Sequence, residues 1–421
     1  MTSAGSPLSD WLARLETFSP HEIELGLDRV LDVLSRMQLE CPERVIHVAG
    51  TNGKGSSVVM LRSLLASTGS IATYMSPHML RYNERICIDG SPASDDEIVA
   101  AFERVDAARG DVPLTYFEFG TLAAMAVFEA RDVDTVVLEV GMGGRLDAVN
   151  AIEPDAGLIT NVSLDHCEWL GNDVEAIGFE KAGIMRPGKP IVFADRQVPA
   201  SVLRSAQEKD ARLICAGRDY RWTPPEAGRW DWFGQSGEIR GLRVPALAGP
   251  VQVQNAAGVL AVVESLGLND LLQPEVIDAA FTDLRLSGRM QSLRFEQEWL
   301  FDVAHNPAAA AALADALRGR GQSTVAIVGM LDDKDVEGVV GELDRCVSRW
   351  IATDVDSPRG IGASELARRI ANHSNRPCLV AESHAEAVEN AREFAGADER
   401  ILVTGSFYLV GPMLEHLGYR D

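Results

Sequence analysis

Residues 44–57 read RVIHVAGTNGKGSS, and this stretch predicts how the first part of the chain folds. Residues 45–49 form a short apolar run, which is typical of a buried parallel strand. A glycine-rich segment follows, and apolar residues then recur at helical spacing as far as Gly69, where a helix is expected to end. A strand, a glycine-rich loop with a lysine, and a helix in this order predict a phosphate-binding loop.

The residue types of this loop suit the binding of anions. Glycines allow backbone N–H groups to turn toward phosphate oxygens, and the following helix points its positive end at them. Lys54 adds a mobile cation for the outer phosphates. The alternative is an ordinary glycine-rich turn, but the lysine, the glycines and the flanking pattern together favour nucleotide binding. Gly55 separates Lys54 from Ser56, whereas the common P-loop reads Gly-Lys-Ser/Thr.

Length and charge limit the classes of protein that fit. A chain of 421 residues is too long for one ordinary core, so two domains are expected. The net charge of −23 disfavours nucleic acid as a partner, because that role needs a basic face. Anionic small molecules would need locally concentrated positive charge, from bound metal ions and from Lys54, Arg81, Arg85, Arg145, Lys181 and Arg289.

The remaining composition predicts a cytoplasmic protein. No run of 18 apolar residues occurs, and the first residues lack a basic segment followed by an apolar core, so neither a membrane span nor a signal peptide is expected. The six cysteines form no Cys-x-x-Cys pair, which predicts reduced structural thiols and no cysteine metal site. A monomer is the expected state.

Polar side chains follow three of the predicted strands. Ser76 comes after the strand at 71–75, Glu139 ends the apolar β-branched run at 135–140, and His166 follows the strand at 156–161. Open α/β sheets bind ligands at the carboxyl ends of their strands. A carboxylate at the end of a buried strand is costly unless it is paired or binds a metal. We therefore predict that Glu139 is a Mg²⁺ ligand, with Ser76 and His166 beside it.

The other patterns predict an α/β first domain with a small β-rich insertion. Helices are expected over 8–40 with a break at Pro20, and over 95–108, 115–130, 174–184, 253–266 and 274–284; a strand is expected at 190–194 and short β elements at 218–250.

Strands and helices alternate regularly from about residue 297, which predicts a second α/β domain with a mostly parallel sheet. We place the domains at 1–291 and 292–421. The predicted strands are 299–303, 323–328, 350–353, 378–381 and 400–404, each followed by a helix.

Nine motifs in this order make the chain resemble the dihydrofolate synthase/folylpolyglutamate synthase family of the muramyl-ligase-like superfamily. They are GTNGKGS, SPHMLRYNERI, TYFEFGTLAA, LEVGMGGRLDAVN, DHCEWLG, EKAGI, SGRMQ, FDVAHNP and GMLDDKD. The resemblance spans nearly the whole chain, and Gly55 matches the folate branch, whereas muramyl ligases usually have Thr after this lysine. It implies an N-terminal P-loop NTPase-type domain and a smaller C-terminal Rossmann-like domain. One departure is small: Met290 stands where Phe is common.

The resemblance also implies the cofactor sites. ATP would be held by Gly50, Thr51, Asn52, Gly53, Lys54, Gly55 and Ser56, with Asn255, Arg289 and Asp302 as further contacts. Ser76, Glu139 and His166 match Mg²⁺ ligands of the family. Lys181 matches a lysine that is carboxylated there and would steady a second Mg²⁺; its residue type alone indicates only a phosphate partner or a solvated lysine. Lys54, Lys181 and His166 are the expected catalytic residues.

The implied reaction is ATP-dependent amide formation in folate biosynthesis and one-carbon metabolism. L-Glutamate would be joined to dihydropteroate, giving dihydrofolate, and to reduced folates, through an acyl phosphate. The segments that match pteroate-binding ones are Glu24, Leu25 and Gly26; Thr115, Tyr116, Phe117 and Glu118; and Leu146, Asp147 and Ala148. Three alternatives remain: a folylpolyglutamate synthase without the first activity, a muramyl-type ligase, and a nucleotide-driven switch without ligase chemistry.

Overall fold

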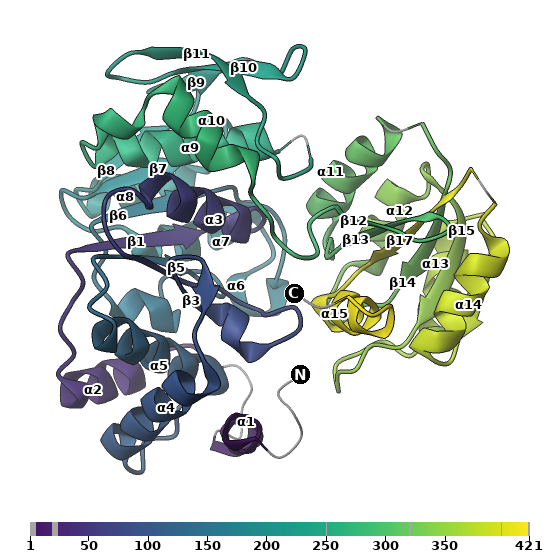
Figure 1. Ribbon diagram of the computed structural model, residues 1–421, viewed down its shortest axis with the longest axis horizontal. Coiled ribbons are helices and arrows are strands. Elements are labelled where there is room, and N and C mark those ends of the chain that lie inside the picture. Colours follow the sequence, from purple (N-terminus) through teal and green to yellow (C-terminus); the bar gives the residue numbers. More distant parts are fainter. Residues whose placement is uncertain (1–5, 19–23, 250, 320, 397, 420–421) are drawn as a thin grey trace. The chain divides into compact units, whose positions relative to one another are not determined.

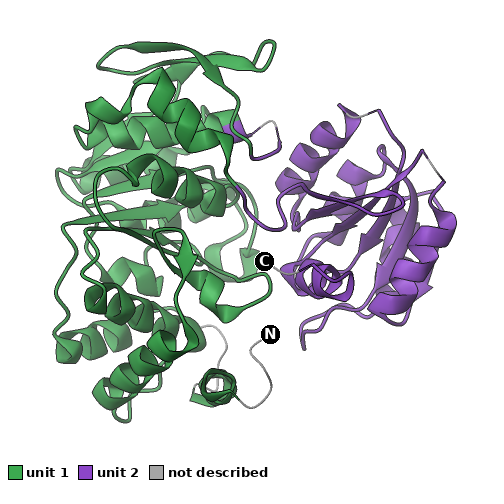
Figure 2. Cartoon of the chain, viewed as in Figure 1, with its two compact units in different colours: residues 1–246, 253–284 green, residues 247–252, 285–421 purple. Residues whose placement is uncertain are grey.

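The computed structural model describes residues 6–18, 24–249, 251–319, 321–396 and 398–419. The chain divides into two compact units, coloured in Figure 2. The first comprises Met1–Ala246 and Val253–Leu284, and the second comprises Leu247–Gln252 and Arg285–Asp421. The units therefore separate slightly before residue 291, and the short segment that contributes to the second unit from within the first was not expected.

An eight-stranded sheet forms the centre of the first unit, in the order β4-β3-β2-β5-β1-β6-β7-β8 (Figure 1). From β2 to β8 the strands are parallel, and β3 and β4 add an antiparallel edge. The central strands are buried along their length, as their continuous apolar sequences predict. The bounds are β1 Arg44–Ala49, β2 Ile71–Tyr74, β3 Ile86–Ile88, β4 Ser91–Pro92, β5 Thr135–Glu139, β6 Ala156–Ile159, β7 Pro190–Phe193 and β8 Arg212–Cys215.

Helices cover both faces of this sheet. On one face, α5 packs against the sheet, and α1, α2 and α4 pack against α5. Helices α3 and α9 cover the opposite face. The bounds are α1 Pro7–Phe18, α2 Asp28–Met37, α3 Lys54–Leu65, α4 Asp95–Arg109, α5 Tyr116–Ala130, α6 Cys167–Leu170, α7 Val174–Lys181, α8 Ala200–Glu208, α9 Gln252–Ser265 and α10 Pro274–Thr282.

A small antiparallel sheet lies in the β-rich region that the sequence predicts. Its order is β11-β10-β9, with β9 Arg221–Trp222, β10 Arg229–Phe233 and β11 Glu238–Arg243. Trp230 and Trp232 are buried, and their indole N–H groups donate to backbone carbonyls of Arg243 and Ala257. The second of these bonds ties the small sheet to α9.

The second unit is built on a six-stranded sheet in the order β12-β13-β17-β14-β15-β16. All its strands are parallel except the edge strand β12, which confirms the predicted mostly parallel sheet. Helices α11, α12 and α13 cover one face and α14 and α15 the other (Figure 1). The bounds are β12 Gln291–Arg294, β13 Glu298–Asp302, α11 Pro307–Arg318, β14 Thr324–Val328, α12 Val336–Leu343, β15 Val347–Thr353, α13 Ala363–His373, β16 Cys378–Ala381, α14 His384–Phe394, β17 Arg400–Thr404 and α15 Phe407–His416.

Most elements agree with the expectations to within a few residues. The expected break at Pro20 lies outside the described residues, between α1 and α2. The antiparallel strands β3, β4 and β12 and the α8–β8 pair were not predicted. All six cysteines are free, as expected.

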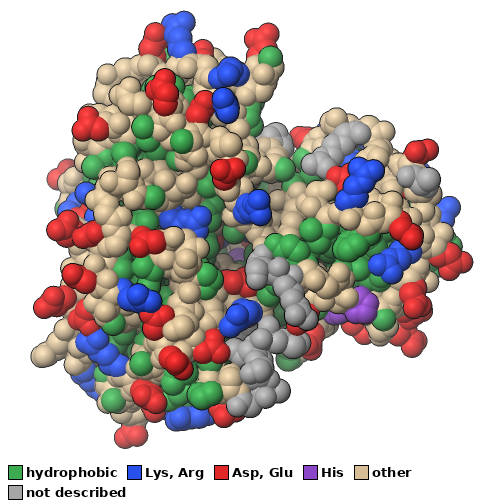
Figure 3. Space-filling view, viewed as in Figure 1, with side chains coloured by type: hydrophobic (Ala, Val, Ile, Leu, Met, Phe, Trp, Pro, Cys, Tyr) green, Lys and Arg blue, Asp and Glu red, His purple; other side chains and the backbone are tan. Residues whose placement is uncertain are grey.

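The surface charge and the helices can be compared with the expected acidic surface and the expected lack of a membrane span. Carboxylates are scattered among Lys and Arg side chains over the face drawn in Figure 3. Among the described residues, no helix is both long and apolar enough to cross a membrane.

Candidate functional site

The glycine-rich loop joins the end of β1 to the start of α3, and two of its glycines are required by close packing. Gly50 has φ +147°, and a Cβ there would lie 1.8 Å from Thr160 Oγ1. Gly53 has φ +84°, and a Cβ there would lie 2.8 Å from Asn255 Oδ1. Gly53 is also the N-cap of α3 and offers no side chain to the first turn. The helix start is therefore suited to an anionic ligand.

Residues after β6 fix the shape of the loop. The N–H groups of Thr51 and Asn52 donate to the backbone and side-chain oxygens of Asn161, at 3.1 and 3.0 Å. Thr160 Oγ1 donates to the carbonyl of Asn52 at 2.6 Å, and Thr51 Oγ1 bonds the backbone of Ser163. The sequence interpretation missed Thr160 and Asn161. Their position after a predicted strand was the available signal.

Lys54 is the first residue of α3 and folds back over the loop. Its Nζ donates to the carbonyls of Gly50 and Thr51, at 3.1 and 3.3 Å. The ammonium therefore lies over the loop that is predicted to hold phosphates. Gly55 and Ser56 follow it in the buried first turn of the helix.

The polar residues at the strand ends lie along one edge of the sheet. Strands β2, β5, β1 and β6 are neighbours in this order and run parallel, so their carboxyl ends share an edge. Ser76 and Glu139 are in direct contact, with the Ser76 N–H 3.3 Å from Glu139 Oε2. Glu139 is 6% exposed, as expected for the end of a buried strand.

His166 follows β6, on the other side of β1 from Glu139. Its backbone is left-handed, with φ +51°, and it precedes the short helix α6. Its N–H donates to Asp165 Oδ1 at 2.9 Å.

Only two of the predicted metal ligands, Glu139 and His166, are residue types that commonly bind metals through their side chains. The described residues contain no cluster of three or more His, Cys, Asp and Glu side chains suited to a metal. The proposed set has one carboxylate and one imidazole and depends on the Ser76 hydroxyl and Lys181 for further ligands. A buried carboxylate beside a hydroxyl suits Mg²⁺, which prefers oxygen and keeps several waters.

Lys181 is the last residue of α7 and is almost fully buried, at 4% exposure. Burial lowers the pKa of its amine to about 7, and the positive charge of Lys54 acts in the same direction. Asp165 and Asp147 oppose the shift. Near neutral pH a large share of this amine is therefore uncharged.

Asp147 organises the loop after β5. It is buried, and its carboxylate accepts N–H groups from Met142 and Val149, at 2.8 and 3.0 Å. Burial raises the pKa of Asp147 to about 6, while these hydrogen bonds and then Lys54 oppose the shift.

Arg29 connects the segments that are predicted to bind pteroate. It donates to Glu118 Oε1 at 2.8 Å and to Glu24 Oε1 at 2.5 Å. The Gly26 N–H donates to the Leu146 carbonyl at 3.3 Å, which joins the third segment. The structure therefore brings together three segments far apart in the sequence. Arg29 itself was missed, because nothing in its local pattern distinguishes it from a solvated helix residue.

Two aromatic side chains lie at the start of α5, in one of the segments predicted to bind pteroate. Thr115 caps α5 through reciprocal bonds with Glu118, which places Tyr116 and Phe117 in the first turn. Both rings are partly exposed, whereas Phe119 is buried in the core.

Other aromatic and basic side chains surround these rings, and the sequence did not single them out as such. Tyr74 packs on Phe117 with ring centroids 5.8 Å apart, and Tyr82 meets Tyr116 at 6.0 Å. The Arg85 guanidinium lies 5.4 Å from the rings of Tyr82 and Tyr116.

Arg289 and Asp302 are neighbours in the second unit. Asp302 accepts the N–H groups of Met290 and Ala304, both at 2.9 Å, and burial raises its pKa while Arg289 opposes the shift. The Arg289 guanidinium lies 5.2 Å from the Phe407 ring. Asn255, the other predicted ATP contact, is buried against Gly53 in the first unit.

A phosphate-type loop at the carboxyl edge of a parallel sheet, with a second α/β unit after it, is the arrangement of a Mur ligase. Residues 48–263 match the Mur ligase middle domain, and residues 288–407 match the Mur ligase, glutamate ligase domain. Within this class the chain belongs to the dihydrofolate synthase/folylpolyglutamate synthase family.

One curated relative and two solved structures illustrate the similarity. The dihydrofolate synthase/folylpolyglutamate synthase of Escherichia coli (strain K12) is 37% identical over 421 residues, covering 99% of this chain and 97% of the relative. The structure of E. coli FolC in complex with DHPP and ADP has a TM-score of 0.92 and 36% identity, covering 99% of both chains. A bifunctional folylpolyglutamate synthase/dihydrofolate synthase with Mn, AMPPNP and L-glutamate bound has a TM-score of 0.89 and 37% identity, covering 99% of both chains.

Proposed function

We propose that this protein is an ATP-dependent ligase that joins L-glutamate to dihydropteroate, giving dihydrofolate, and then to reduced folates. The single observation that carries the proposal is the phosphate loop beside the Ser76–Glu139 contact, in a chain 37% identical over its length to a bifunctional synthase. A buried carboxylate next to a phosphate-binding loop suits the metal-assisted transfer of a phosphoryl group.

The reaction requires an activated carboxylate. The pteroate carboxylate attacks the γ-phosphorus of ATP, ADP leaves, and an acyl phosphate forms. The α-amine of L-glutamate then attacks the acyl carbon, phosphate leaves, and the amine loses a proton. Lys54, which lies over the loop, spreads the charge of the transferred group, and we assign the same role to Arg289. Asn255 and Asp302 are the other proposed ATP contacts.

We assign Mg²⁺ to Ser76, Glu139 and His166. The ion would neutralise phosphate charge where two carboxylate substrates and ATP meet. We further propose a second Mg²⁺ and a carboxylated Lys181. An uncharged amine attacks CO₂ and loses a proton to give a carbamate, and the burial that lowers the pKa of Lys181 to about 7 supplies that uncharged amine. The product is an anion able to bind a cation, whereas the ammonium is not.

The substrate segments joined by Arg29 are proposed to bind the pteroate. Partly exposed Tyr116 and Phe117 offer flat apolar faces to a pterin ring. Glu24, Leu25, Gly26, Thr115, Glu118, Leu146, Asp147 and Ala148 are assigned to the same site. In the described geometry Asp147 and Glu118 mainly brace these loops.

The decisive experiment is a side-by-side assay of ADP release. Purified protein receives Mg-ATP and L-glutamate with either dihydropteroate or tetrahydrofolate, and each product is identified by mass. Turnover with both acceptors is expected. Turnover with tetrahydrofolate alone would leave the narrower folylpolyglutamate synthase, and none with either would refute the proposal. A muramyl-type ligase would release ADP only with a muramyl acceptor.

Replacing Glu139 tests the metal assignment and separates a ligase from a nucleotide-driven switch. Glu139→Ala is expected to lower kcat by about 100-fold or more while the circular dichroism spectrum stays native, because the charge stabilisation of the transition state is lost. Glu365→Ala, at an exposed carboxylate that pairs with Arg368 in the second unit, is the control. Normal kcat in Glu139→Ala would exclude Glu139 as a metal ligand. ATP binding without acceptor-dependent turnover in the wild-type protein would favour the switch.

A further inference from the structure

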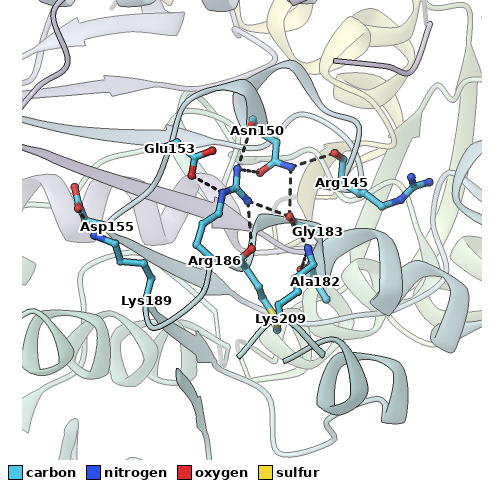
Figure 4. A network of polar contacts seen from close by, with 10 residues as sticks. Arg145, Asn150, Glu153, Asp155, Ala182, Gly183, Arg186, Lys189 and Lys209 are labelled. Carbon is cyan, nitrogen blue, oxygen red and sulfur yellow. Dashed lines mark hydrogen bonds and ion pairs between the residues drawn. The ribbon is translucent and has the colours of Figure 1, made fainter. Parts of the chain in front are cut away.

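The turn directly after Lys181 is held by three polar side chains, one from just beyond the turn and two from distant parts of the first unit (Figure 4). Lys209 Nζ donates to the carbonyls of Ala182 and Gly183, at 3.3 and 3.1 Å. Arg186 Nη1 and Asn150 Nδ2 both donate to the Gly183 carbonyl at 3.3 Å. One carbonyl oxygen two residues from Lys181 therefore accepts from three donors.

Arg186 and Asn150 also bind each other and the loop after β5. Arg186 Nη2 donates to the backbone oxygen and Oδ1 of Asn150, at 3.0 and 3.1 Å. Asn150 Nδ2 donates to the Arg145 carbonyl at 3.1 Å. The loop at 141–147, which Asp147 organises, and the turn after Lys181 therefore share one network, as Figure 4 shows.

The backbones of these two segments approach too closely for a side chain at Gly183 or Gly144. A Cβ on Gly183 would lie 2.2 Å from Arg145 Cα, and a Cβ on Gly144 would lie 2.8 Å from the Glu180 carbonyl. The Arg145 N–H donates to that same carbonyl at 2.8 Å. A shift of the Ala182–Gly183 turn would consequently move the loop at 141–147 as well.

Helix α8 holds α7 at both ends. Glu175, in the first turn of α7, accepts the N–H groups of Ala200 and Ser201 at the start of α8, at 2.9 and 2.5 Å. Lys209 is the C-cap of α8 and reaches the carbonyls just beyond the end of α7. Cations at a helix C-terminus are favourable, since they meet its negative end.

Lys209 is placed differently from an ordinary surface lysine. Burial lowers the pKa of Lys209 below its usual value, and the charges of Arg186 and Arg145 lower it further. An amine in this environment, bonded to two backbone carbonyls, costs free energy that no ion pair described for it offsets. The two hydrogen bonds tie Lys209 to the backbone directly after Lys181.

We propose that Asn150, Arg186 and Lys209 are positioning residues, which hold the Ala182–Gly183 turn and thereby fix the backbone that carries Lys181 against the loop at 141–147 in the ligase site. The inference rests on the proposed function, in which Lys181 acts as a carbamate. The described contacts of the three residues to this turn all end on backbone carbonyls, so we assign them a role through the backbone that carries Lys181.

Lys209→Met tests this inference, because methionine replaces the aliphatic part of the lysine side chain but lacks the ammonium that donates to Ala182 and Gly183. Lys189→Met is the matched control: Lys189 is a nearby lysine, paired with Asp155 at 2.9 Å and half exposed. In Lys209→Met we expect kcat to fall about 10- to 100-fold with the KM for ATP within about twofold of wild type, since a small misplacement of a reacting group lowers kcat. Lys209→Arg, which keeps donors for both carbonyls, is expected to recover most of kcat.

A second readout does not depend on turnover. Protein equilibrated with ¹³C-bicarbonate is expected to give a carbamate carbon signal in NMR, weaker in Lys209→Met than in Lys189→Met. Added bicarbonate is expected to restore part of kcat in Lys209→Met by mass action, which it would not do for a merely unstable protein. If Lys209→Met does not fold, Arg186→Met is measured in the same way.

The outcomes separate this inference from the proposed function. If wild type releases no ADP with either acceptor, the proposed function fails. If wild type is active and folded Lys209→Met matches Lys189→Met in kcat and carbamate signal, the positioning role alone is refuted. Parallel changes in kcat and in the KM for ATP would also refute it, because they would indicate general damage to the site.

Discussion

Burial lowers the pKa values of two basic side chains in the first unit, Lys181 and His47. Burial lowers the pKa of Lys181 to about 7, with Lys54 acting in the same direction and Asp165 and Asp147 opposing it. His47 lies in the middle of β1 with no exposure, and both of its ring nitrogens lack hydrogen-bond partners among the described residues. Burial, with a smaller contribution from Arg186, lowers the pKa of His47 to about 3. It is held as a neutral core residue.

His47 therefore makes the folded state sensitive to acid. Its folded pKa lies below its unfolded value, so the unfolded chain binds the extra proton between about pH 6.5 and pH 3. The stability that depends on neutral His47 is fully present above pH 6.5 and is lost as the pH falls toward 3. Between pH 7 and pH 5 we expect His47 to remove about 2 kcal/mol from the free energy of unfolding.

Urea unfolding of wild type and His47→Leu at pH 7 and pH 5 measures this contribution. The difference between the two pH values should be about 2 kcal/mol smaller in His47→Leu, since leucine does not titrate. Other groups titrate equally in both proteins, so they cancel. An identical pH dependence in both would mean that His47 has the same pKa in the folded and unfolded states.

Residues of the site could be predicted from sequence where they follow a strand or belong to a motif. Ser76 and Glu139 were placed at one edge by their strand ends alone, and they are in contact. Arg29, Asn150 and Lys209 could not be found in this way. Their partners lie far away in the sequence, and a single Arg, Asn or Lys in a polar pattern is usually solvated.

At the scale of elements, the β1–loop–α3 unit depends on strand β6. The loop backbone bonds Asn161 and Thr160, so the shape of the phosphate site is set by a neighbouring strand as well as by its own glycines. A side chain at Gly50 would displace Thr160 and break that connection.

Gly50→Ala is therefore expected to weaken nucleotide binding. Its Cβ would lie 1.8 Å from Thr160 Oγ1, which must move and lose its bond to Asn52. We expect the Kd for Mg-AMPPNP, measured by calorimetry, to rise about tenfold or more, since each donor lost to the loop costs about 1–3 kcal/mol.

Gly237→Ala is the control for backbone strain. Gly237 has φ +159° and no atom within 4 Å of an added Cβ, so its substitution imposes comparable strain in open space. Each variant is expected to lose about 1–3 kcal/mol of stability from strain, but only Gly50→Ala should lose nucleotide affinity. If Gly50→Ala and Gly237→Ala bind Mg-AMPPNP with equal affinity, the loop tolerates a side chain at Gly50.

Long apolar strands and capped helices were the elements that sequence could predict. The central strands read as continuous apolar runs, and α4 and α5 carry capping boxes. The edge strands β4 and β12, and β3 beside β4, have only two to four residues and are too short for a periodic signal. Their pairing is decided by neighbours, which local patterns do not report.

At the scale of the whole molecule, charge opposes the proposed substrates. The net charge is −23, while ATP, glutamate and pteroates are all anions. The scattered carboxylates in Figure 3 create a long-range negative potential, and the loop offers positive charge only at short range. The enzyme is therefore expected to bind anions that its overall field repels.

Added salt should consequently increase the rate at which ATP associates with the protein. Raising ionic strength from about 0.01 to about 0.1 M shortens the screening length from about 30 to about 10 Å, which removes the distant repulsion and leaves the short contacts of Lys54. We expect kcat/KM for ATP, at fixed free Mg²⁺, to rise about threefold over this range. Potassium chloride and potassium acetate should give the same rise if screening is the cause. A fall in kcat/KM with both salts would mean that local positive charge already governs association, so that the −23 net charge has no part in substrate capture.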